Sequence, residues 1–292
     1  MISVVIPVWN RAHIVQRTLR SLECQTMAPR RIILVDNNST DDTLQVLRTW
    51  AAERPNLATV LTCDTPGAAA ARNCGLAAVD TDYVMFFDSD DAMPPRHIEE
   101  VTAGIRAAGN PQVAYFDAEM HNLDGTISAK SARRGSILFN HIFHATLATQ
   151  RYAISTQLIR SIGGWDETTR GWDDYELGVR ILAASPTLTH IKLTQPVAIY
   201  LQETSITGTN FHSKAGEWEH ALGCCEKTLR NAGLTRAAKL IRYRRAILAG
   251  KYMAEGHPEL VSGLTPTPFM KLIAQFVAHG GRGVAEIARV FG

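Results

Sequence analysis

The sequence lacks three features that would place it in a simple class of protein. It has no run of the roughly 18 to 20 apolar residues that a membrane-spanning helix requires, and its first residues show neither the basic segment nor the small-residue cleavage site of a secretory signal. Charge of one sign is also missing, because 30 Lys and Arg face 28 Asp and Glu. The net charge of +2 argues against a dedicated nucleic-acid-binding protein.

Cysteine is scarce as well. The five cysteines are an odd number and form no C-x-x-C pair, which fits neither a disulfide framework nor a zinc site and fits a reducing compartment. We therefore expect a cytoplasmic protein. A hydrophobic fraction of 46% is typical of globular chains and excludes disorder, and 292 residues allow one large domain or two of ordinary size.

The first 120 residues alternate between short apolar runs and helical stretches. We expect strands at the continuously apolar runs 4–8, 32–35, 57–61, 84–87 and 113–116. We expect helices near 12–24, 41–53, 68–79 and 95–108. Strands that are apolar throughout are buried on both faces, and helical crossovers between them imply parallel pairing. The pattern predicts an α/β fold with a doubly wound, mostly parallel sheet and flanking helices.

The remainder of the chain predicts a change in architecture. Short antiparallel strands are expected within 117–155, and helices and strands are expected at 156–162, 173–184, 188–192 and 197–202. From 211 onwards the pattern is helical. We therefore predict a domain over 1–210, with a donor half at about 1–116 and an acceptor half at about 117–210, followed by a helical region over 211–292.

An acidic turn follows the fourth predicted strand. Asp88, Asp90 and Asp91 lie within four residues, and three neighbouring carboxylates need a compensating cation if they are to be buried. Oxygen ligands of this kind suit Mg²⁺ or Mn²⁺, which bind one or two carboxylates together with phosphate oxygens. The alternative is a solvated acidic turn that caps the next helix. The carboxyl ends of parallel strands meet at one edge of the sheet, where ligands bind, so the turn indicates a metal site.

Seven segments, in order, resemble those of family 2 glycosyltransferases with the GT-A fold. They are Ser3–Arg11 (SVVIPVWNR), Gln25-Thr26, Ile33–Asp41 (ILVDNNSTD), Ala71–Leu76 (ARNCGL), Phe87–Asp91 (FDSDD, a DXD motif), Gly163–Glu167 (GGWDE) and Trp172–Glu176 (WDDYE). The resemblance covers roughly residues 1–207. It implies a hexosyltransferase-like enzyme of polysaccharide biosynthesis that transfers a sugar from a nucleotide-diphosphate donor to a hydroxyl of a glycan or lipid-linked acceptor, with a divalent metal and inversion of the anomeric centre.

The resemblance also assigns a donor site. The matching positions are Pro7, Val8, Trp9, Asn10, Asp36, Asn37, Arg72, Asp88, Ser89 and Asp90. Trp9 offers an aromatic face for the base, with core packing as the alternative, and Asp36 and Asn37 lie where the family reads the base. The family often has a second acidic residue at the position of Asn37. A UDP-sugar is the donor we expect, and thymidine and guanosine donors stay open because of that difference.

The metal ligand expected first is Asp90. Asp88 would serve the ribose or the outer shell of the Mn²⁺ or Mg²⁺ ion, and Asp91 could share either task. His212, downstream, is a further candidate for the metal or the diphosphate, with a surface position as its alternative. Arg72 can pair with a phosphate or with a strand-end carboxylate.

The acceptor side centres on the acidic pair Asp173 and Asp174. The resemblance suggests Asp174 as the base that takes the proton of the acceptor hydroxyl, with Asp173 as an orienting or acceptor contact. The alternative is that both acids only stabilise the start of a helix. Trp165 and Trp172 flank the preceding glycine-containing loop and are expected to form a platform for the acceptor sugar.

Three stretches depart from the family or carry no readable code. The segment Tyr200–Thr207 lacks the basic or histidine residue that family members often have before Ser-Ile-Thr, so a phosphate contact there is not expected. The loops 117–155 and 203–213 do not reveal the acceptor.

The C-terminal helices, within 236–291, carry basic and apolar residues that suit packing on the catalytic domain, peripheral contact with the inner face of an anionic membrane, or a homodimer.

Two other functions stay open on the sequence alone. The D-x-D of Phe87–Asp90 superficially matches a haloacid-dehalogenase-like phosphatase, although that motif belongs on a first strand and continues with Thr or Val. A non-catalytic nucleotide-sugar-binding protein is the second, and Asn37 and Glu203 are the departures that keep it open. Retention of both Asp90 and Asp174 argues against it.

Overall fold

The computed structural model describes residues 1–202 and 210–291. The chain forms two compact units, each assembled from separate stretches of sequence. The first comprises Met1–Arg133, Thr146–Arg170 and Ser185–Glu203, and the second comprises Arg134–Ala145, Gly171–Ala184 and Thr204–Gly292. The division into domains at residue 210 stays a prediction.

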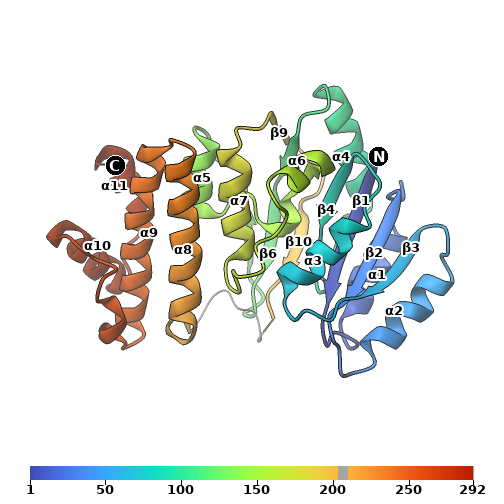
Figure 1. Ribbon diagram of the computed structural model, residues 1–292, viewed down its shortest axis with the longest axis horizontal. Coiled ribbons are helices and arrows are strands. Elements are labelled where there is room, and N and C mark those ends of the chain that lie inside the picture. Colours follow the sequence, from blue (N-terminus) through green and yellow to red (C-terminus); the bar gives the residue numbers. More distant parts are fainter. Residues whose placement is uncertain (203–209, 292) are drawn as a thin grey trace. The chain divides into compact units, whose positions relative to one another are not determined.

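The first unit is built on a mixed sheet, which has seven strands in the described part of the chain, in the order β3-β2-β1-β4-β8-β5-β9 (Figure 1). The strands are β1 (Ile2–Val8), β2 (Arg31–Asp36), β3 (Ala58–Thr62), β4 (Tyr83–Phe86), β5 (Val113–Phe116), β8 (Tyr152–Ser155) and β9 (Leu188–Ile191). Neighbouring strands run parallel except where β8 pairs with β4 and β5. The predicted fold class is confirmed.

Helices cover both faces of this sheet. They are α1 (Val15–Glu23), α2 (Thr43–Ala52), α3 (Ala68–Ala77), α4 (His97–Ala107) and α6 (Thr156–Ser161). Successive side chains of a strand point to opposite faces. In β1, Val4 and Ile6 therefore join a core with apolar residues of α1, α2 and α4, whereas Val5 faces α3. This two-sided burial explains why β1 is apolar throughout.

A glycine permits the close approach of α3 to the sheet. A Cβ atom at Gly75 would lie 2.4 Å from a methyl carbon of Val5 and 3.1 Å from one of Val35. No real side chain tolerates the first distance, so only glycine lets α3 pack at this depth. The packing places Arg72, one turn earlier on α3, against the same sheet.

The strand order creates a topological switch point between β1 and β4. The chain moves from β1 outwards to β2 and β3, and then returns to place β4 on the other side of β1. The loops that leave the carboxyl ends of β1 and β4 diverge here, and open α/β sheets bind their ligands in the resulting crevice. The residues after Val8 and after Phe86 are therefore the first to inspect for a site.

A second, smaller sheet adjoins the loop after β4. In the described residues it has the order β10-β6-β7, formed by β10 (Val197–Tyr200), β6 (Ala118–His121) and β7 (Ile127–Lys130). Ala92, just after the acidic turn, forms an isolated antiparallel bridge with Ala198 of β10. The acidic turn is thus fixed from two directions, by β4 and by β10.

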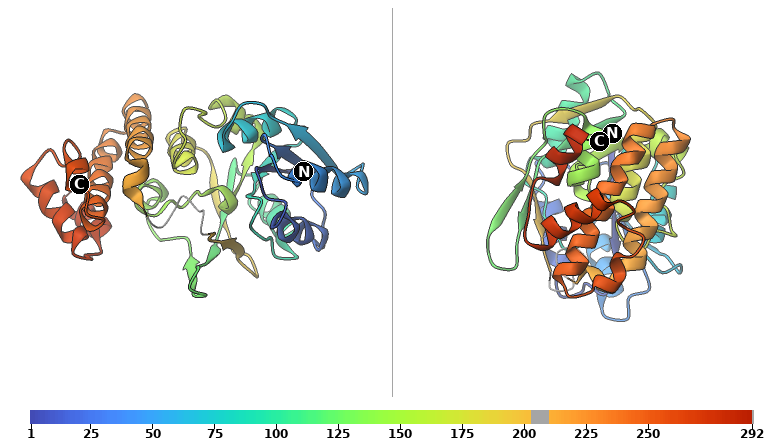
Figure 2. Two further views of the ribbon diagram at one scale, coloured as in Figure 1. Left: turned by 90° about the horizontal axis from the view of Figure 1, so that it is seen from below. Right: turned by 90° about the vertical axis from the view of Figure 1, so that its left-hand side faces the viewer.

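The second unit is helical. Its elements are α5 (Ile137–His144), α7 (Asp173–Ala183), α8 (Ala215–Asn231), α9 (Thr235–Ala254), α10 (Pro268–Ala278) and α11 (Val284–Phe291), with short 3₁₀ turns η2 (Phe211–Lys214) and η3 (Pro258–Val261). Figure 2 shows α8, α9 and α10, in orange and red, packed side by side. The core of the helical unit contains the buried aromatic residues Tyr175, Trp218, Tyr243 and Tyr252.

The predicted strands and helices are confirmed with one difference. Helix α5 lies within 117–155, where short antiparallel strands are predicted. The apolar residues of α9, including Leu240, Ile241 and Leu248, are buried in the helical core. Exposed apolar side chains occur on α10 and α11, at Phe269, Leu272, Phe276, Val290 and Phe291. Membrane contact and a homodimer stay predictions.

No helix in the described ranges combines the length and the apolar character needed to cross a bilayer.

One buried histidine makes the stability of the first unit sensitive to acid. His97, at the start of α4, is 1% exposed and packs edge-on against Phe116, and neither ring nitrogen has a hydrogen-bond partner among the described residues. Burial lowers the pKa of His97 to about 3. The native ring therefore stays neutral while the unfolded ring takes up a proton below about pH 6.5, so the free energy of unfolding falls as the pH drops from 6.5 towards 3.

We expect His97→Leu to reduce this acid sensitivity. Between pH 7 and pH 5 the histidine lowers the free energy of unfolding by about 2 kcal/mol, and the variant should lose about that much less over the same interval. Urea denaturation at the two pH values measures the difference, with the exposed His13→Leu as the control. An equal response to pH in the wild type and in His97→Leu would show that another group is responsible.

Candidate active site

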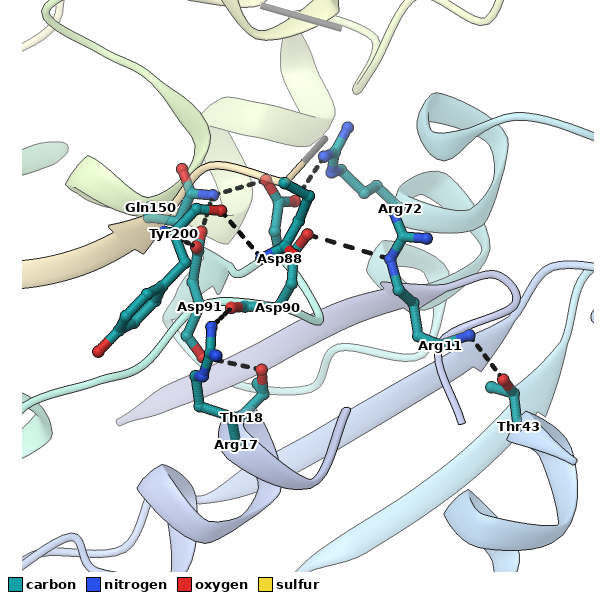
Figure 3. Close-up of polar contacts among 11 residues, drawn as sticks. Arg11, Arg17, Thr18, Thr43, Arg72, Asp88, Asp90, Asp91, Gln150 and Tyr200 are labelled. Atoms are coloured by element: carbon teal, nitrogen blue, oxygen red, sulfur yellow. Dashed lines mark hydrogen bonds and ion pairs between the residues drawn. The ribbon is translucent and has the colours of Figure 1, made fainter. Parts of the chain in front are cut away.

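The loops after β1 and β2 are fastened to each other by hydrogen bonds. The backbone N–H of Thr40 donates to Asn10 Oδ1 at 2.8 Å, and the N–H of Arg11 donates to Thr43 Oγ1 at 2.8 Å. Asn10 itself has a positive φ of 50°, a conformation that asparagine tolerates better than most residues. The turn at Asn10 directs Arg11 towards the acidic turn after β4 (Figure 3).

Asp36, at the end of β2, presents a buried acceptor with no partner. The side chain is 3% exposed, and Oδ2 accepts a hydrogen bond from the N–H of Ser39 at 3.3 Å. Oδ1 has no hydrogen-bond partner among the described residues. A buried carboxylate oxygen without a donor is costly, so this atom is placed for an N–H or O–H group supplied by a ligand.

The Asn37 side chain is hydrogen-bonded to three backbone groups. Its Nδ2 donates to the carbonyls of Cys63 and Thr65, at 2.8 and 2.7 Å, and its Oδ1 accepts from the N–H of Gly67 at 2.8 Å. These three bonds hold the loop between β3 and α3. The amide NH₂ group of Asn37 thus has two backbone acceptors. Contact of Asn37 with a base stays a prediction.

Trp9 is a surface residue. It is 58% exposed at the end of β1, next to Pro7 and Val8 of that strand and to Asn10. Core packing, the alternative raised for this tryptophan, does not apply. An exposed ring beside the strand-end loops is available to stack on a base.

Asp88 is held by two donors. Arg72 donates from Nη2 to Asp88 Oδ1 at 2.8 Å, and Gln150 donates from Nε2 to Asp88 Oδ2 at 2.5 Å (Figure 3). Gln150 belongs to the 3₁₀ turn η1 (Thr149–Arg151) and is separated from Asp88 by 62 residues. Arg72 is buried and the Asp88 side chain is 32% exposed, so the ion pair is partly shielded from solvent. A strand-end carboxylate is one of the two partners predicted for Arg72, and the Asp88 contact confirms it.

Asp91 is a buried support of the turn. It is 1% exposed, its Oδ1 accepts from the N–H of Tyr200 at 2.7 Å, and its Oδ2 accepts from Gln150 at 2.5 Å. Burial, together with the charges of Asp88 and Asp90, raises the pKa of Asp91 well above its usual range. Both oxygens already have donors, so Asp91 joins the turn to β10. Its predicted part in metal binding stays a prediction, as does that of the adjacent Ser89, 6% exposed, in donor binding.

Of the three carboxylates in the acidic turn, that of Asp90 has the weakest contact with a donor among the described residues. Its ion pair with Arg11 spans 4.0 Å, at the limit of such contacts, and its backbone carbonyl accepts from Arg17 at 3.3 Å. Burial and the charge of Asp88 raise the pKa of Asp90 to about 6. Asp90 is thus the third acid of a crowded, partly buried turn, and it has no close cation among the described residues. Its carboxylate can supply one ligand of a divalent metal, and further ligands must come from elsewhere.

The acidic turn suits a metal site whose coordination is completed by phosphate oxygens of a substrate. In the described part of the chain no three or more His, Cys, Asp or Glu side chains are grouped to hold a metal ion by themselves. Mg²⁺ and Mn²⁺ sites that use one or two carboxylates complete their coordination with water and phosphate oxygens. Asp90, with Asp88 beside it, suits that type of site.

Arg72 is positioned by a buried tryptophan. Its Cζ lies 4.3 Å from the centroid of the Trp165 ring, and that ring is 2% exposed and packs edge-on against Phe86 at 5.1 Å. Asn73 donates to the carbonyl of Trp165 and accepts from its N–H, at 2.9 and 2.8 Å. A Cβ at Gly164 would lie 2.6 Å from Asn73 Oδ1, which explains the glycine.

Two segments of the family pattern that lie 92 residues apart therefore interlock around Arg72. Trp165 supports the guanidinium from within the core. Its predicted role as an acceptor platform stays a prediction.

The acidic pair lies at the start of α7, in the helical unit. Asp173 and Asp174 are the first two residues of the helix and are half-buried, and Asp174 Oδ1 accepts from the N–H of Tyr175 at 2.7 Å. Trp172 precedes them in the left-handed conformation, with φ of 56°. The arrangement agrees with helix stabilisation by acids in a first turn, and it leaves the catalytic roles of this pair as predictions.

His212, the remaining predicted ligand, is tied to other residues of the helical unit. Its Nδ1 pairs with Glu255 at 2.9 Å, and its ring stacks on His257 at 3.9 Å. A role in metal binding stays a prediction. The departure from the family at Glu203–Thr207 lies outside the described residues.

Several residues of the site escaped the sequence analysis. Gln150 bridges two of the acids, Thr18 donates to the carbonyl of Asp91 at 2.8 Å, and Arg17 lies over the ring of Tyr200 at 4.0 Å (Figure 3). Arg11 belonged to a matched segment but was given no role. The position of Arg11 in the loop after the first strand was the one feature of the sequence that pointed to the site. Gln150, Thr18 and Arg17 reach the acidic turn only through the fold.

Comparison with known structures defines the class of protein. The structure of S. aureus TarS residues 1–349 in complex with UDP matches with a TM-score of 0.67 at 18% identity, over 100% of this chain and 92% of that one. The mannosyltransferase PcManGT from Pyrobaculum calidifontis, in complex with GDP-Man and Mn²⁺, matches with a TM-score of 0.52 at 18% identity, over 100% and 79%. The fold is that of GT-A glycosyltransferases.

Sequence comparison then gives the family. The model of "Glycosyl transferase family 2" matches residues 3–150, about half of the chain, which therefore belongs to this family. An uncharacterized glycosyltransferase of Haemophilus influenzae is 28% identical over 219 residues, 73% of this chain and 69% of that protein. The minor teichoic acid biosynthesis protein GgaA of Bacillus subtilis is 24% identical over 190 residues, 60% of this chain and 41% of that protein.

The chain is thus an enzyme, a family 2 glycosyltransferase. It spans about two thirds of the first of these relatives and well under half of the second. The phosphatase and the non-catalytic binding protein are not favoured by these comparisons.

Proposed function

We propose that the chain transfers a sugar from a UDP-sugar to a hydroxyl of a cell-surface or extracellular glycan precursor, with a bound divalent metal and with inversion at the anomeric carbon. The observation that carries the proposal is the distribution of donors around the acidic turn. Asp88 and Asp91 each accept two close hydrogen bonds, whereas among the described residues the Asp90 carboxylate has only Arg11, at 4.0 Å. The turn is built to hold one carboxylate ready for a cation.

Asp90 and the phosphates of the donor would hold Mn²⁺ or Mg²⁺. Such an ion supplies a Lewis acid that stabilises the negative charge developing on the leaving diphosphate. The chain's own residues have complementary tasks. Gln150 and Arg72 fix Asp88 beside Asp90, and Arg11 reaches the same turn from the neighbouring strand. The Mn²⁺ named with PcManGT supports a metal requirement by analogy.

The base-binding part of the site consists of Trp9 and Asp36. The exposed ring of Trp9 stacks on the base, and Asp36 Oδ1, which lacks a donor, accepts the imide N–H of uracil. The UDP named with TarS supports this choice of nucleotide. Guanosine remains the alternative suggested by the GDP-Man of PcManGT.

Asp174 is the proposed base for the acceptor hydroxyl, and Asp173 is the proposed acceptor contact. A positioned carboxylate can take the proton as the hydroxyl oxygen attacks, and a single displacement inverts the anomeric centre. An acceptor built in glycan assembly agrees with the teichoic acid pathway named for GgaA. Five free cysteines agree with the reducing cytoplasm as the place of the reaction.

Nucleotide selectivity tests the donor assignment. In the wild type with Mn²⁺, we expect saturating UDP to raise the melting temperature by several degrees, with affinity at least about tenfold above that for CDP. In Asp36→Asn the amide oxygen can keep the hydrogen bond from Ser39, and an N–H group then replaces the free acceptor. Binding should shift from UDP towards CDP, because cytosine offers an acceptor where uracil offers an N–H.

The matched control is Asp64→Asn, which removes one negative charge from an exposed position in the loop after β3. It should keep the preference for UDP. A preference for GDP in the wild type would contradict the uridine assignment, and UDP binding that ignores Mn²⁺ and Mg²⁺ would contradict the metal.

A further inference from the structure

A pocket of about 200 Å³ lies within the helical unit. Its walls are the aromatic residues Trp172 and Phe211, and the rest of its lining comes from Arg244, Ile247, Leu248 and Lys251 of α9. Pockets for whole drug-sized ligands measure about 300–1,000 Å³. The smaller volume suits one chemical group of a larger molecule.

The two cations of the pocket are held by aromatic rings. Arg244 Cζ lies 5.2 Å from the centroid of the Trp172 ring and 5.4 Å from that of Tyr175, and Lys251 Nζ lies 4.0 Å from that of Phe211. Neither cation forms an ion pair with any described residue. Rings stabilise a cation without cancelling its charge, so both charges remain available to an anion.

Glu255, whose negative charge acts on Lys251, has three other polar contacts. Glu255, one turn further along α9, accepts hydrogen bonds from the N–H groups of Phe211 and His212 and pairs with the His212 ring, each at 2.9 Å. Burial and the neighbouring Arg244 lower the pKa of Lys251. An anion in the pocket would relieve that repulsion.

The aromatic walls are rigid because one residue braces both. The Trp218 ring lies 4.8 Å from the Trp172 ring and 6.3 Å from the Phe211 ring, and its Nε1 donates to the carbonyl of Phe211 at 2.9 Å. A Cβ at Gly171 would lie 2.6 Å from the Trp218 ring, so glycine allows this contact. The pocket is therefore formed before any ligand arrives, which lowers the cost of binding.

The pocket adjoins the proposed base in sequence and in structure. Trp172 is both a wall of the pocket and the residue that precedes Asp173 and Asp174 at the start of α7. A group in the pocket therefore contacts the residue that directly precedes the acidic pair. The two cations also offset the repulsion that these carboxylates would exert on an anion.

We propose that this pocket binds a phosphate group of the acceptor, with Arg244 and Lys251 contacting its oxygens. A phosphate carries enough oxygens and charge for two cations, and a guanidinium can bind two of the oxygens at once. The proposal rests on the proposed function, because it makes the molecule in the pocket the acceptor. It gives the acceptor a chemical class, a phosphorylated sugar or polyol.

The test compares glycerol 3-phosphate with uncharged glycerol as probes. The full chain is prepared with 5-fluorotryptophan, and the ¹⁹F resonance of Trp172 is assigned by its loss in Trp172→Phe. The pocket variant is Arg244→Gln with Lys251→Gln. The matched control is Arg236→Gln with Lys239→Gln, which changes one Arg and one Lys of the same helix at exposed positions outside the pocket. Lys251→Gln alone serves if the double variant does not fold.

Glycerol 3-phosphate should shift the Trp172 resonance in the wild type and in the control, and glycerol should not. The pocket variant should bind the phosphate probe at least about tenfold more weakly, with UDP affinity unchanged. Equal weakening in both double variants, or equal binding of glycerol, would overturn the proposal. Binding of phosphatidylglycerol vesicles that depends on Arg244 and Lys251, without binding of glycerol 3-phosphate, would overturn it in favour of a membrane contact.

The measurement of UDP separates this proposal from the proposed function. If UDP binds the wild type but glycerol 3-phosphate binds no better than glycerol, only the assignment of the pocket to an acceptor phosphate is wrong. If UDP does not bind the wild type, the donor site is wrong, whatever the pocket does.

Discussion

Asp90→Asn is expected to lower kcat/KM for sugar transfer by about 10²- to 10³-fold, because a bound metal contributes several kcal/mol to the stabilisation of a leaving diphosphate. UDP should bind the variant weakly, and Mn²⁺ should no longer improve that binding. Asparagine keeps the shape of the side chain and removes one of three clustered negative charges. The free variant should therefore be at least as stable as the wild type, so lost activity cannot be attributed to unfolding.

Two measurements check this expectation. Isothermal titration with UDP, with and without Mn²⁺, reports the metal dependence, and thermal denaturation of the free proteins reports stability. Asp80→Asn is the matched control, because Asp80 is exposed and lies before β4, at the other end of that strand from the acidic turn. Metal-dependent UDP binding of wild-type strength in Asp90→Asn would refute the metal assignment.

Asp174→Asn is expected to lower kcat by about 10²- to 10⁴-fold, the usual contribution of a general base. The affinity for UDP should be unchanged, because the proposed donor contacts come from the loops after β1, β2 and β4. The asparagine oxygen can still accept the hydrogen bond from Tyr175, so the start of α7 should keep its structure. Steady-state rates with a series of UDP-sugars and acceptors, together with UDP titrations, separate kcat from donor binding.

The control for Asp174 is Glu286→Gln, which changes an exposed acid in the first turn of another helix of the same unit. Each substitution removes a favourable interaction with the helix dipole, worth about 0.3–1 kcal/mol. Only the Asp174 variant should lose transfer. If both variants lose only a little stability and keep full activity, Asp174 stabilises the helix and the base lies elsewhere.

The sequence was sufficient for the sheet and for the metal candidate because both depend on local patterns. A strand buried on two faces is apolar throughout, which makes β1, β2 and β4 readable without any partner. The acidic turn is equally local, since the three carboxylates lie within four residues. Parallel pairing then predicts that the ends of these strands meet, as Arg11 and Asp90 do at the switch point.

The support around the turn could not be read from the sequence, because it depends on contacts across long separations. Gln150 lies 62 residues from Asp88 and has no neighbouring motif. Helix α5 was missed for a related reason. Its residues Asn140 and His141 are polar, yet they are buried, and His141 pairs with the carbonyl of Tyr175, 34 residues away. A local sequence pattern does not predict that a residue is buried when the residues that cover it come from a distant segment.

The helical unit is discontinuous, and this affects where the chain can be shortened. Residues of α5 and α7 lie in the same core as those of α8 and α9, including Ile142, Tyr175, Trp218 and Tyr243. A chain cut at residue 210 would keep α5 and α7 and lose their packing partners. Their apolar faces would then meet water, and the support for Asp173 and Asp174 would disappear. A fragment that keeps the proposed base in place must therefore extend well into the C-terminal helices.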